Sequence, residues 1–328
     1  MKARFHFLTT TASLRLVLVI GAILLGPGHA GAEPFAPDIL KSVVSVLPEW
    51  PGYGTNSDTN GGRPKNPEGS AVAILAGGYL ATNVHVLGAA TKINIRLDDG
   101  RLLPGTIIGR DPRTDIALIK APIDLAVPDF GPTPKLGGRV CAVGNQFGLG
   151  LSVTCGVTSA LHRTGTGFNP IEDFIQTDAV VNPGGSGGAL VDGVGRLIGL
   201  VSAIFTKDSD ANIGVNFASS LDLVLRVAHD LKEHGRVVYG KSGIVVRPLS
   251  EVERATLSGA MIARIAPDSA GAKAGLQTGD ILKTIGGRAV HKTSDVPAAL
   301  HLNRPGDSIA INFLRDGQQQ TTSLVLLP

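Results

Sequence analysis

The chain contains few aromatic residues and few cysteines. Only 4% of its 328 residues are aromatic, and one of these is tryptophan, whereas glycine occurs 43 times. Scarce aromatics, abundant glycine and frequent β-branched runs favour a sheet-rich protein with many turns over a helical bundle. The length is sufficient for two domains, or for one large core with a small module.

Long hydrophobic runs are missing after the N-terminal region. The longest apolar run covers 16–25 and follows three basic residues. A bilayer span needs about 20 apolar residues, so this run is too short. Together with the small residues Ala30-Gly-Ala32, it predicts a secretory signal peptide over 1–32, cleaved after Ala32. An uncleaved N-terminal anchor is the alternative. We expect a periplasmic or secreted protein without a membrane span after cleavage.

The expected mature chain has no excess of positive or negative charge. The full sequence has 30 basic and 27 acidic residues, and its formal charge is +3. Residues 1–32 hold three of the basic residues and none of the acidic ones, so 27 of each remain. A net charge near zero gives no support for a nucleic-acid partner. The eight histidines are scattered without metal-ligand spacing, so no metal site is predicted.

The two cysteines, Cys141 and Cys155, flank a segment from Gly144 to Gly150 that is typical of a β-hairpin turn. Antiparallel pairing could place the two cysteines opposite each other. An oxidising compartment would then permit a disulfide. Two buried free thiols are an equally weighted alternative.

Short β-type runs recur at a spacing of roughly 8–12 residues through the first two thirds of the chain, as expected for an antiparallel barrel or sandwich. A short helix running into a strand is expected at 36–47, before these runs. The β-type runs include 71–75, 93–97, 116–119, 140–143, 153–157 and 197–204.

A helical pattern over 220–235 interrupts the strands. Ser219 or Ser220 can cap its start, and Gly235 ends it. After Gly235 comes a second unit with the size and pattern of a small α+β module. Its expected strands are 244–246, 261–265, 281–285, 309–314 and 323–327, with helical patches near 270–274 and 295–301.

Ser186 lies between two pairs of glycines in the run Asn182-Pro-Gly-Gly-Ser-Gly-Gly-Ala189. The glycines allow positive φ values, and the N–H groups of Gly184 and Ser186 could together face an oxyanion. The run alone is equally typical of a flexible linker. A serine hydroxyl is a poor nucleophile unless a base takes its proton. A catalytic role therefore requires a base and an orienting carboxylate elsewhere in the chain.

His85 and Asp115 are the candidates for these two roles. His85 ends an apolar strand, and Asp115 directly precedes another. A buried carboxylate that accepts the Nδ1 proton of a histidine fixes its tautomer and stabilises the imidazolium. The nearby Asp111 is expected to be a solvated turn former beside Pro112. A lone histidine in a β protein is usually structural, so the order His, Asp, Ser along the chain carries the argument.

Four sequence blocks stand out along the chain: Thr82–Val86, Asp111–Leu118, Val143–Gly150 and Gln176–Leu190. In this order and spacing they resemble the HtrA (Deg) family of exported serine proteases. The resemblance implies a mainly β fold, with a chymotrypsin-like double β-barrel protease domain over 33–235. A small α+β PDZ domain over 236–328 is implied by the similarity of 267–282 to that domain in the family.

The resemblance also implies the catalytic roles. His85 would be the general base, Asp115 its orienting partner and Ser186 the nucleophile. Gly184 and Ser186 would supply the oxyanion N–H groups. No metal or organic cofactor is implied.

Two further regions take their expected roles from the family. Val181 and Val215 would line the substrate pocket, so cleavage after small or medium aliphatic residues is expected. Ser242, Gly243 and Ile244 would form the loop of the PDZ domain that binds C-terminal peptides.

Three positions depart from the family pattern. Gly185 replaces a common asparagine before the serine, which makes the oxyanion loop more flexible. Asn216 replaces a frequent glycine beside the substrate strand. Ser242 occupies an apolar position of the PDZ loop, and neighbouring Lys241 is expected to be a solvated surface charge.

The leading hypothesis is an exported endopeptidase that degrades misfolded or unfolded envelope proteins and docks their C-termini on its PDZ domain. The family resemblance also implies a homotrimer built through the segment around Phe35. One alternative is a regulatory protease that cuts a single substrate when a peptide binds the PDZ domain. The other is a chaperone or peptide-binding scaffold whose triad is idle.

Overall fold

The structure is a computed structural model that describes residues 37–50, 68–204 and 213–328. The expected signal peptide and Phe35 lie outside the described residues. Within the described ranges, every helix is too short or too polar to cross a bilayer.

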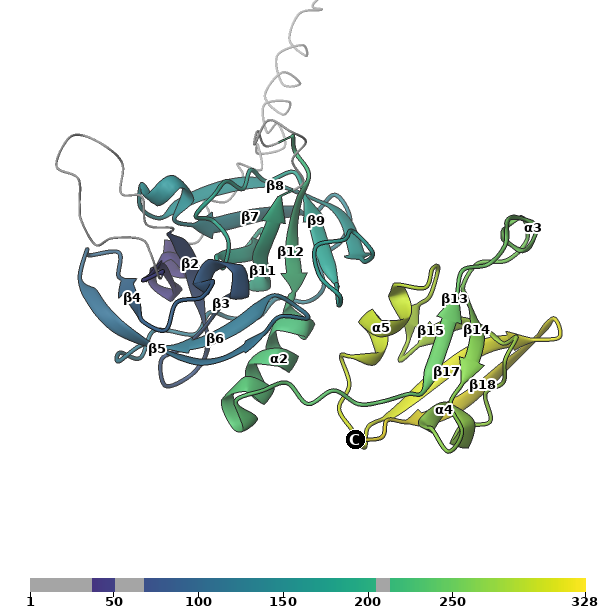
Figure 1. Ribbon diagram of the computed structural model, residues 1–328. Helices are drawn as coiled ribbons and strands as arrows, with labels where there is room; N and C mark the ends of the chain where they lie inside the picture. The colour runs from purple at the N-terminus through teal and green to yellow at the C-terminus, as the bar shows by residue number, and fades with distance from the viewer. Residues whose placement is uncertain (1–36, 51–67, 205–212) are drawn as a thin grey trace, which may run out of the picture. The chain divides into compact units, whose positions relative to one another are not determined.

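A closed antiparallel barrel of six strands forms the first part of the described chain (Figure 1). The strand order is β1-β2-β3-β6-β5-β4. Fully buried Leu80, Ile95 and Ile119 contribute to its core. The helical turns are η1 (Pro37–Ser42) and α1 (Val84–Leu87), and the strands are β1 (Val43–Pro48), β2 (Gly69–Leu75), β3 (Tyr79–Asn83), β4 (Ile93–Arg96), β5 (Leu102–Asp111) and β6 (Ile116–Lys120).

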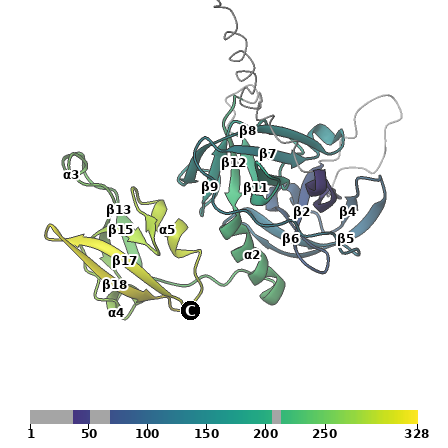
Figure 2. The ribbon, with the colours of Figure 1, turned by 180° about the vertical axis from the view of Figure 1, so that it is seen from behind.

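A second closed barrel follows, with the order β10-β11-β12-β9-β8-β7. Cys141 and Cys155 are register partners on β7 and β8, and a disulfide joins them. Figure 2 shows these strands from behind. The elements are β7 (Arg139–Gly144), η2 (Gln146–Gly148), β8 (Ser152–Arg163), β9 (Phe174–Thr177), β10 (Ala189–Asp192), β11 (Leu197–Ile204) and β12 (Asn216–Ser220).

Helix α2 (Leu221–His234) packs against strands of both barrels. The Ser220 side chain caps it by accepting from the N–H of Leu223, and Gly235 ends it in the left-handed conformation. Leu223, Val227 and Leu231 bury its apolar face. The helix thus forms where its periodicity and caps predict it.

The C-terminal residues form a mixed α+β unit around a six-stranded sheet in the order β13-β14-β15-β17-β18, with β16 paired to β15. Among the described strands, β13 pairs with β14 alone and is therefore an edge strand of this sheet. The elements are β13 (Ile244–Arg247), α3 (Glu251–Arg254), β14 (Ala260–Ile265), α4 (Ala270–Lys273), β15 (Ile281–Ile285), β16 (Arg288–Ala289), α5 (Asp295–Leu300), β17 (Ser308–Arg315) and β18 (Gln318–Val325).

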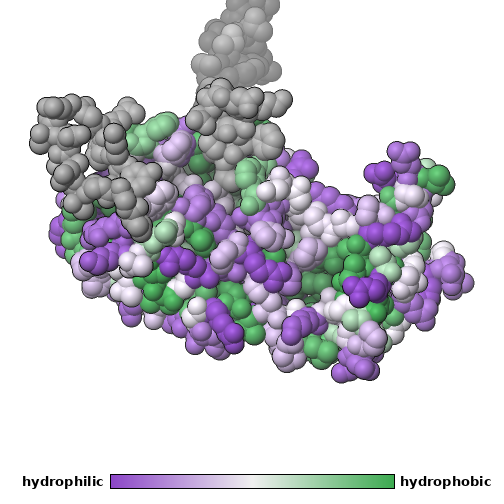
Figure 3. Space-filling model, in the orientation of Figure 1, coloured by the Kyte–Doolittle hydropathy of each residue, from purple (hydrophilic) through white to green (hydrophobic). Residues whose placement is uncertain are grey.

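Hydrophobic and hydrophilic side chains are interspersed over the described part of the face in Figure 3. The largest fully buried side chains are aliphatic, with Phe174 as an aromatic exception. The cores of these barrels are therefore built mainly from aliphatic side chains such as Val, Ile and Leu.

The strands agree with the sequence pattern in most places and differ in two respects. The recognised runs omit β5, β9, β10, β12 and the two-residue β16, and β18 begins at Gln318, well before the expected 323. Asp111 is not a solvated turn residue as predicted: it is 5% exposed and ends β5. Its carboxylate accepts hydrogen bonds from the hydroxyls of Thr114 and Tyr239, which explains its burial.

Candidate active site

The three candidate catalytic residues come from both barrels and line one cleft of about 550 Å³. His85 lies in α1 directly after β3, and Asp115 lies directly before β6. Ser186 lies in the loop before β10 of the second barrel. Because all three residues lie close to a barrel strand in sequence, the barrel frames restrict the backbone at these positions.

Asp115 contacts His85 through both carboxylate oxygens. One oxygen lies 2.5 Å from His85 Nδ1, and the other accepts the His85 backbone N–H at 2.9 Å. The side chain of Asp115 is 15% exposed and that of His85 is 50% exposed. The carboxylate therefore holds the imidazole so that Nε2 is left for the cleft.

The backbone of Asp115 is also fixed. It adopts a positive φ of 59°, and its carbonyl accepts from the Asn83 side chain and from the Val84 N–H, each at 3.0 Å. Aspartate tolerates this left-handed conformation better than most residues. The strained turn aims the carboxylate at His85.

The hydroxyl of Ser186 donates to the carbonyl of Ser202 on β11 at 3.4 Å. Among the described residues, no acceptor is hydrogen-bonded to the backbone N–H of Gly184 or of Ser186. Both residues line the cleft. Two unpaired N–H groups beside a serine can bind an oxyanion.

The glycines around Ser186 are not equivalent. Gly184 and Gly187 have φ values of 92° and 83°, and a Cβ on Gly187 would lie 2.0 Å from the carbonyl oxygen of Ser70. A Cβ on Gly188 would lie 2.2 Å from the carbonyl oxygen of Val143. Gly185 has an ordinary φ, and its nearest neighbour would be 3.1 Å away. The extra glycine is thus the one that the loop does not require.

The two predicted pocket residues differ in their positions. Val181 lines the cleft beside Asn182, whereas Val215 is not among the described residues that line it. Phe168 forms part of the wall and packs against Phe217 with ring centroids 5.7 Å apart. Asn216 is fully buried and donates to the carbonyl of Ala179 at 2.9 Å.

The predicted PDZ loop leads into edge strand β13. Gly243 has a φ of 69°, and the Ser242 hydroxyl accepts from the N–H of Ile244 at 3.2 Å. The carbonyls of Ser242 and Gly243 are held by the N–H groups of Gly271 and Ala266. Lys241 is exposed, as expected.

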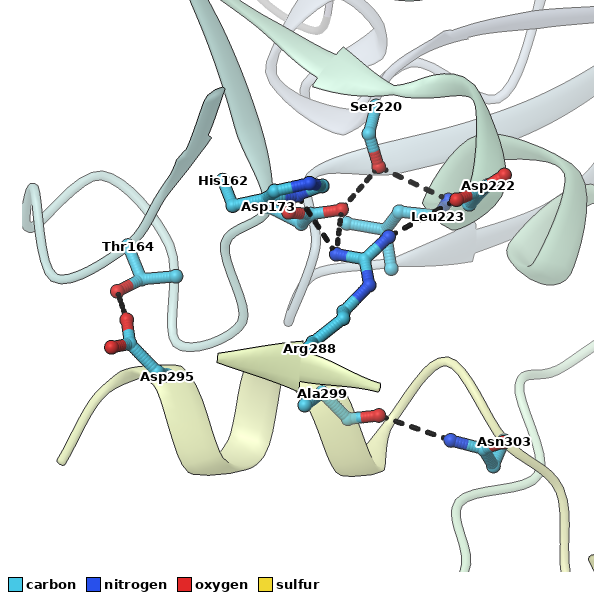
Figure 4. Close-up of polar contacts among 10 residues, drawn as sticks. All are labelled: His162, Thr164, Asp173, Ser220, Asp222, Leu223, Arg288, Asp295, Ala299 and Asn303. Carbon is cyan, nitrogen blue, oxygen red and sulfur yellow. Dashed lines mark hydrogen bonds and ion pairs between the residues drawn. The ribbon is translucent and has the colours of Figure 1, made fainter. Parts of the chain in front are cut away.

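A second histidine–aspartate pair escaped the sequence analysis (Figure 4). His162 Nδ1 lies 2.8 Å from buried Asp173, which also accepts from Ser220 at 2.5 Å and from Arg288 at 2.6 Å. Arg288 Nη1 lies 3.1 Å from the same His162 nitrogen, and Nη2 donates to Asp222 at 3.0 Å. Burial opposes ionisation of Asp173, but these donors and the Arg288 charge outweigh it and lower its pKa to about 2.

Sequence reasoning also missed Glu68, Ser70 and Asn145, which contact the Ser186 loop or support it. Asn145 lies in one of the family-like blocks but received no role. Glu68 directly precedes β2 and Ser70 is the second residue of that strand, where the sequence shows only an acidic residue before a Gly-Ser pair.

Known proteins share this architecture. Residues 69–200 match the trypsin-like peptidase domain, and residues 212–326 match the PDZ domain. The periplasmic pH-dependent serine endoprotease DegQ of Escherichia coli K12 is 33% identical, and the match covers 97% of this chain and 75% of DegQ. The chain belongs to the HtrA family of serine proteases.

Further HtrA proteins support this placement. Periplasmic serine endoprotease DegP of Escherichia coli K12 is 39% identical over 79% of this chain, which spans only 56% of the length of DegP. The solved HtrA-type protease AlgW with a tripeptide is 35% identical, with a TM-score of 0.68 over 88% of this chain and 94% of that one. The fold of this HtrA chain is accordingly the chymotrypsin-like double barrel with a PDZ domain.

Proposed function

We propose that the chain is an exported serine endopeptidase that hydrolyses peptide bonds of unfolded or misfolded envelope proteins. One observation carries the proposal: the paired His85 and Asp115 share a cleft with Ser186 and two unpaired N–H groups. A nucleophile, a base, an orienting carboxylate and an oxyanion site are the parts that acyl transfer needs.

In the proposed reaction, the Ser186 oxygen attacks the peptide carbonyl while His85 Nε2 takes its proton. Asp115 stabilises the resulting imidazolium, and the N–H groups of Gly184 and Ser186 bind the oxyanion. The intermediate collapses to an acyl-enzyme as His85 protonates the leaving amine. Water, deprotonated by His85, then releases the acid product and regenerates Ser186.

Val181 supports a preference for small or medium aliphatic residues before the cleaved bond, because this apolar side chain lines the cleft. Phe168 forms a further apolar part of the wall. The described lining contains the acidic residues Glu68 and Asp115, and both carboxylates already have partners. Lysine or arginine at this position of the substrate would therefore find no unpaired carboxylate.

We assign the PDZ domain to 236–328 and peptide docking to the loop Ser242–Ile244 and edge strand β13. An edge strand offers unpaired backbone groups to which an extended peptide can add. The AlgW structures, determined with a tripeptide or a decapeptide, support peptide binding in this architecture.

We further assign 1–32 to a signal peptide and 33–235 to the protease domain. The periplasmic names of DegP and DegQ support export to that compartment. A homotrimer through the segment around Phe35 completes the proposal and rests on the family resemblance alone.

Labelling with a fluorophosphonate probe tests the proposed nucleophile. The protein should be labelled, and Ser186→Ala should not, because the probe reacts with an activated serine. Ser202→Ala in the same cleft is the matched control and should still be labelled. Absence of labelling of the unsubstituted protein, with and without added C-terminal peptides, would favour the scaffold alternative.

A further inference from the structure

The oxyanion loop is rich in glycine, yet the peptide groups on both sides of Gly184 are held by hydrogen bonds. The Pro183 carbonyl accepts from the Phe147 N–H at 2.7 Å. In a trans peptide the C=O and the following N–H point in opposite directions. Fixing the Pro183 carbonyl on Phe147 therefore aims the Gly184 N–H the other way.

The next peptide is held by a residue of the other barrel. Ser70 on β2 donates its hydroxyl to the Gly184 carbonyl at 2.7 Å and accepts the Asn145 N–H at 2.8 Å. The Ser70 backbone N–H also donates to the Ser186 carbonyl at 2.8 Å. Ser70 is completely buried, so water cannot replace these bonds.

Asn145 is fixed in turn by Glu68. The Asn145 amide donates to the Glu68 carboxylate at 2.7 Å, and Arg96 donates to the same carboxylate oxygen at 2.6 Å. The Asn145 side-chain oxygen accepts the Gly150 N–H at 2.8 Å. Arg96 and Glu68 are half-buried, which strengthens a charge-assisted contact relative to an exposed one.

We propose that Ser70 and Glu68 are positioning residues that hold the Gly184 N–H in place for the oxyanion, with Asn145 as the link between them. The proposal rests on the proposed function, because it assigns a role relative to Ser186 chemistry. It gives the first barrel a part in catalysis besides His85 and Asp115. It also explains how a loop with an additional glycine can be ordered without a bound ligand.

The test compares Ser70→Ala with Ser45→Ala in the full chain. Ser45 is the register partner of Ser70 on β1 and is also buried, so it controls for the loss of a buried hydroxyl. Loss of an oxyanion donor costs about 100- to 1,000-fold in kcat, and Ser70→Ala leaves the donor present but less fixed. We expect kcat on a dye-quenched peptide with valine before the cleaved bond to fall about 10- to 100-fold. KM should change less than about threefold, and Ser45→Ala should retain kcat.

A pair of inhibitors separates positioning from a general structural effect. The Ser186 oxygen adds to the carbonyl carbon of a peptide aldehyde as His85 takes the hydroxyl proton, and the resulting hemiacetal places an oxyanion in the site. The matching peptide alcohol has no carbonyl at this position and cannot react. Ser70→Ala should weaken aldehyde binding about tenfold or more and leave alcohol binding unchanged. Equal effects on both inhibitors, or an unchanged kcat, would overturn the proposal.

Glu68 provides a second test if Ser70→Ala does not fold. Glu68→Ala should lower kcat and aldehyde binding about tenfold, and Glu68→Gln, which can still accept from Asn145, should recover most of the loss. Equal activity of Glu68→Ala and the unsubstituted protein would overturn the role of Glu68. Ser186→Ala distinguishes the two proposals: if it cleaves the peptide as well as the unsubstituted protein, the proposed function fails and the positioning role falls with it.

Discussion

Two histidine–aspartate pairs in this chain have similar geometry and different surroundings. The distance from Nδ1 to the carboxylate is 2.5 Å in His85–Asp115 and 2.8 Å in His162–Asp173, and the two rings are about equally exposed. Each pair even has a serine nearby. The two pairs differ in the hydrogen-bond partners of the nearby serine hydroxyl and of the aspartate carboxylate.

Beside the His162–Asp173 pair, Ser220 donates its hydroxyl directly to the Asp173 carboxylate. Arg288 donates to that carboxylate and lies against the histidine nitrogen as well. The carboxylate is thus saturated and balanced by a permanent cation. Among the described residues, the Asp115 carboxylate, by contrast, is bonded only to the ring and the backbone N–H of His85. We infer that a serine, a histidine and an aspartate form a catalytic unit only when, as at Ser186, the hydroxyl is not bonded to the carboxylate.

The largest expected difference lies between the two serines. Ser186→Ala should lower kcat about a million-fold, as expected when a triad nucleophile is removed. Ser220→Ala should lower it less than about tenfold, because that hydroxyl caps α2 and bonds a carboxylate. Steady-state hydrolysis of a quenched peptide measures both. Comparable losses of kcat in Ser186→Ala and Ser220→Ala would contradict the different roles that we give to the His85–Asp115 and His162–Asp173 pairs.

Replacing the two aspartates by asparagine should give kcat values that differ by a smaller factor than those of the serine variants. Asp115→Asn should reduce kcat about 10,000-fold, because an amide favours the wrong histidine tautomer. Asp173→Asn should reduce it less than about tenfold while lowering stability. Activity and urea unfolding of both variants, measured on the same preparations, check this. A loss of activity in Asp173→Asn as large as that in Asp115→Asn would show that the second pair also takes part in catalysis.

The ionisation of Asp173 should make the free energy of unfolding depend on pH. Its pKa is about 2 in the folded protein against an ordinary value of 3.8, so the folded state favours the ionised form. This difference contributes about 2 kcal/mol above pH 4, and the contribution is lost as the pH falls towards 2. The stability gap between the unsubstituted protein and Asp173→Asn should close over that range in urea titrations. A gap that stays constant from pH 7 to pH 2.5 would contradict this assignment.

The smallest effect is expected for Arg288→Gln. Asp173 keeps the donors Ser220 and His162 in this variant, so we expect a loss of about 1 kcal/mol of unfolding free energy. Chemical unfolding at neutral pH measures it, with Arg101→Gln, from the exposed Arg101–Asp99 pair, as the control. A loss greater than that of Asp173→Asn would mean that Arg288, and not the carboxylate, organises the cluster.

The features that the sequence predicts are the local ones. The helix over 221–234 follows from its periodicity, its serine cap and its terminal glycine. Strand β5 was not recognised because it contains Pro104, Gly105 and Gly109 and has partly exposed positions throughout most of its length. A period of two is hard to see in such a strand.

The features that the sequence cannot predict depend on distant partners. Asp111 looks like a turn residue beside a proline, but its burial is explained by Tyr239, which lies 128 positions further on. The Asp173 cluster joins residues as far apart as Arg288, and the Ser70–Gly184 bond joins the two barrels. His85, Asp115 and Ser186 were recognisable because family-like motifs mark them, whereas Ser70 has no such mark.

The unequal glycines around Ser186 have a consequence for how this protein can change during evolution. Gly187 and Gly188 admit no side chain without moving backbone atoms, whereas at Gly185 an added Cβ would require only a slight shift of the Asn182 carbonyl. Random substitution and selection for activity should therefore yield alternatives at position 185 while the other two stay invariant. Position 185 is where natural drift or a designer can adjust the rigidity of the loop without rebuilding it.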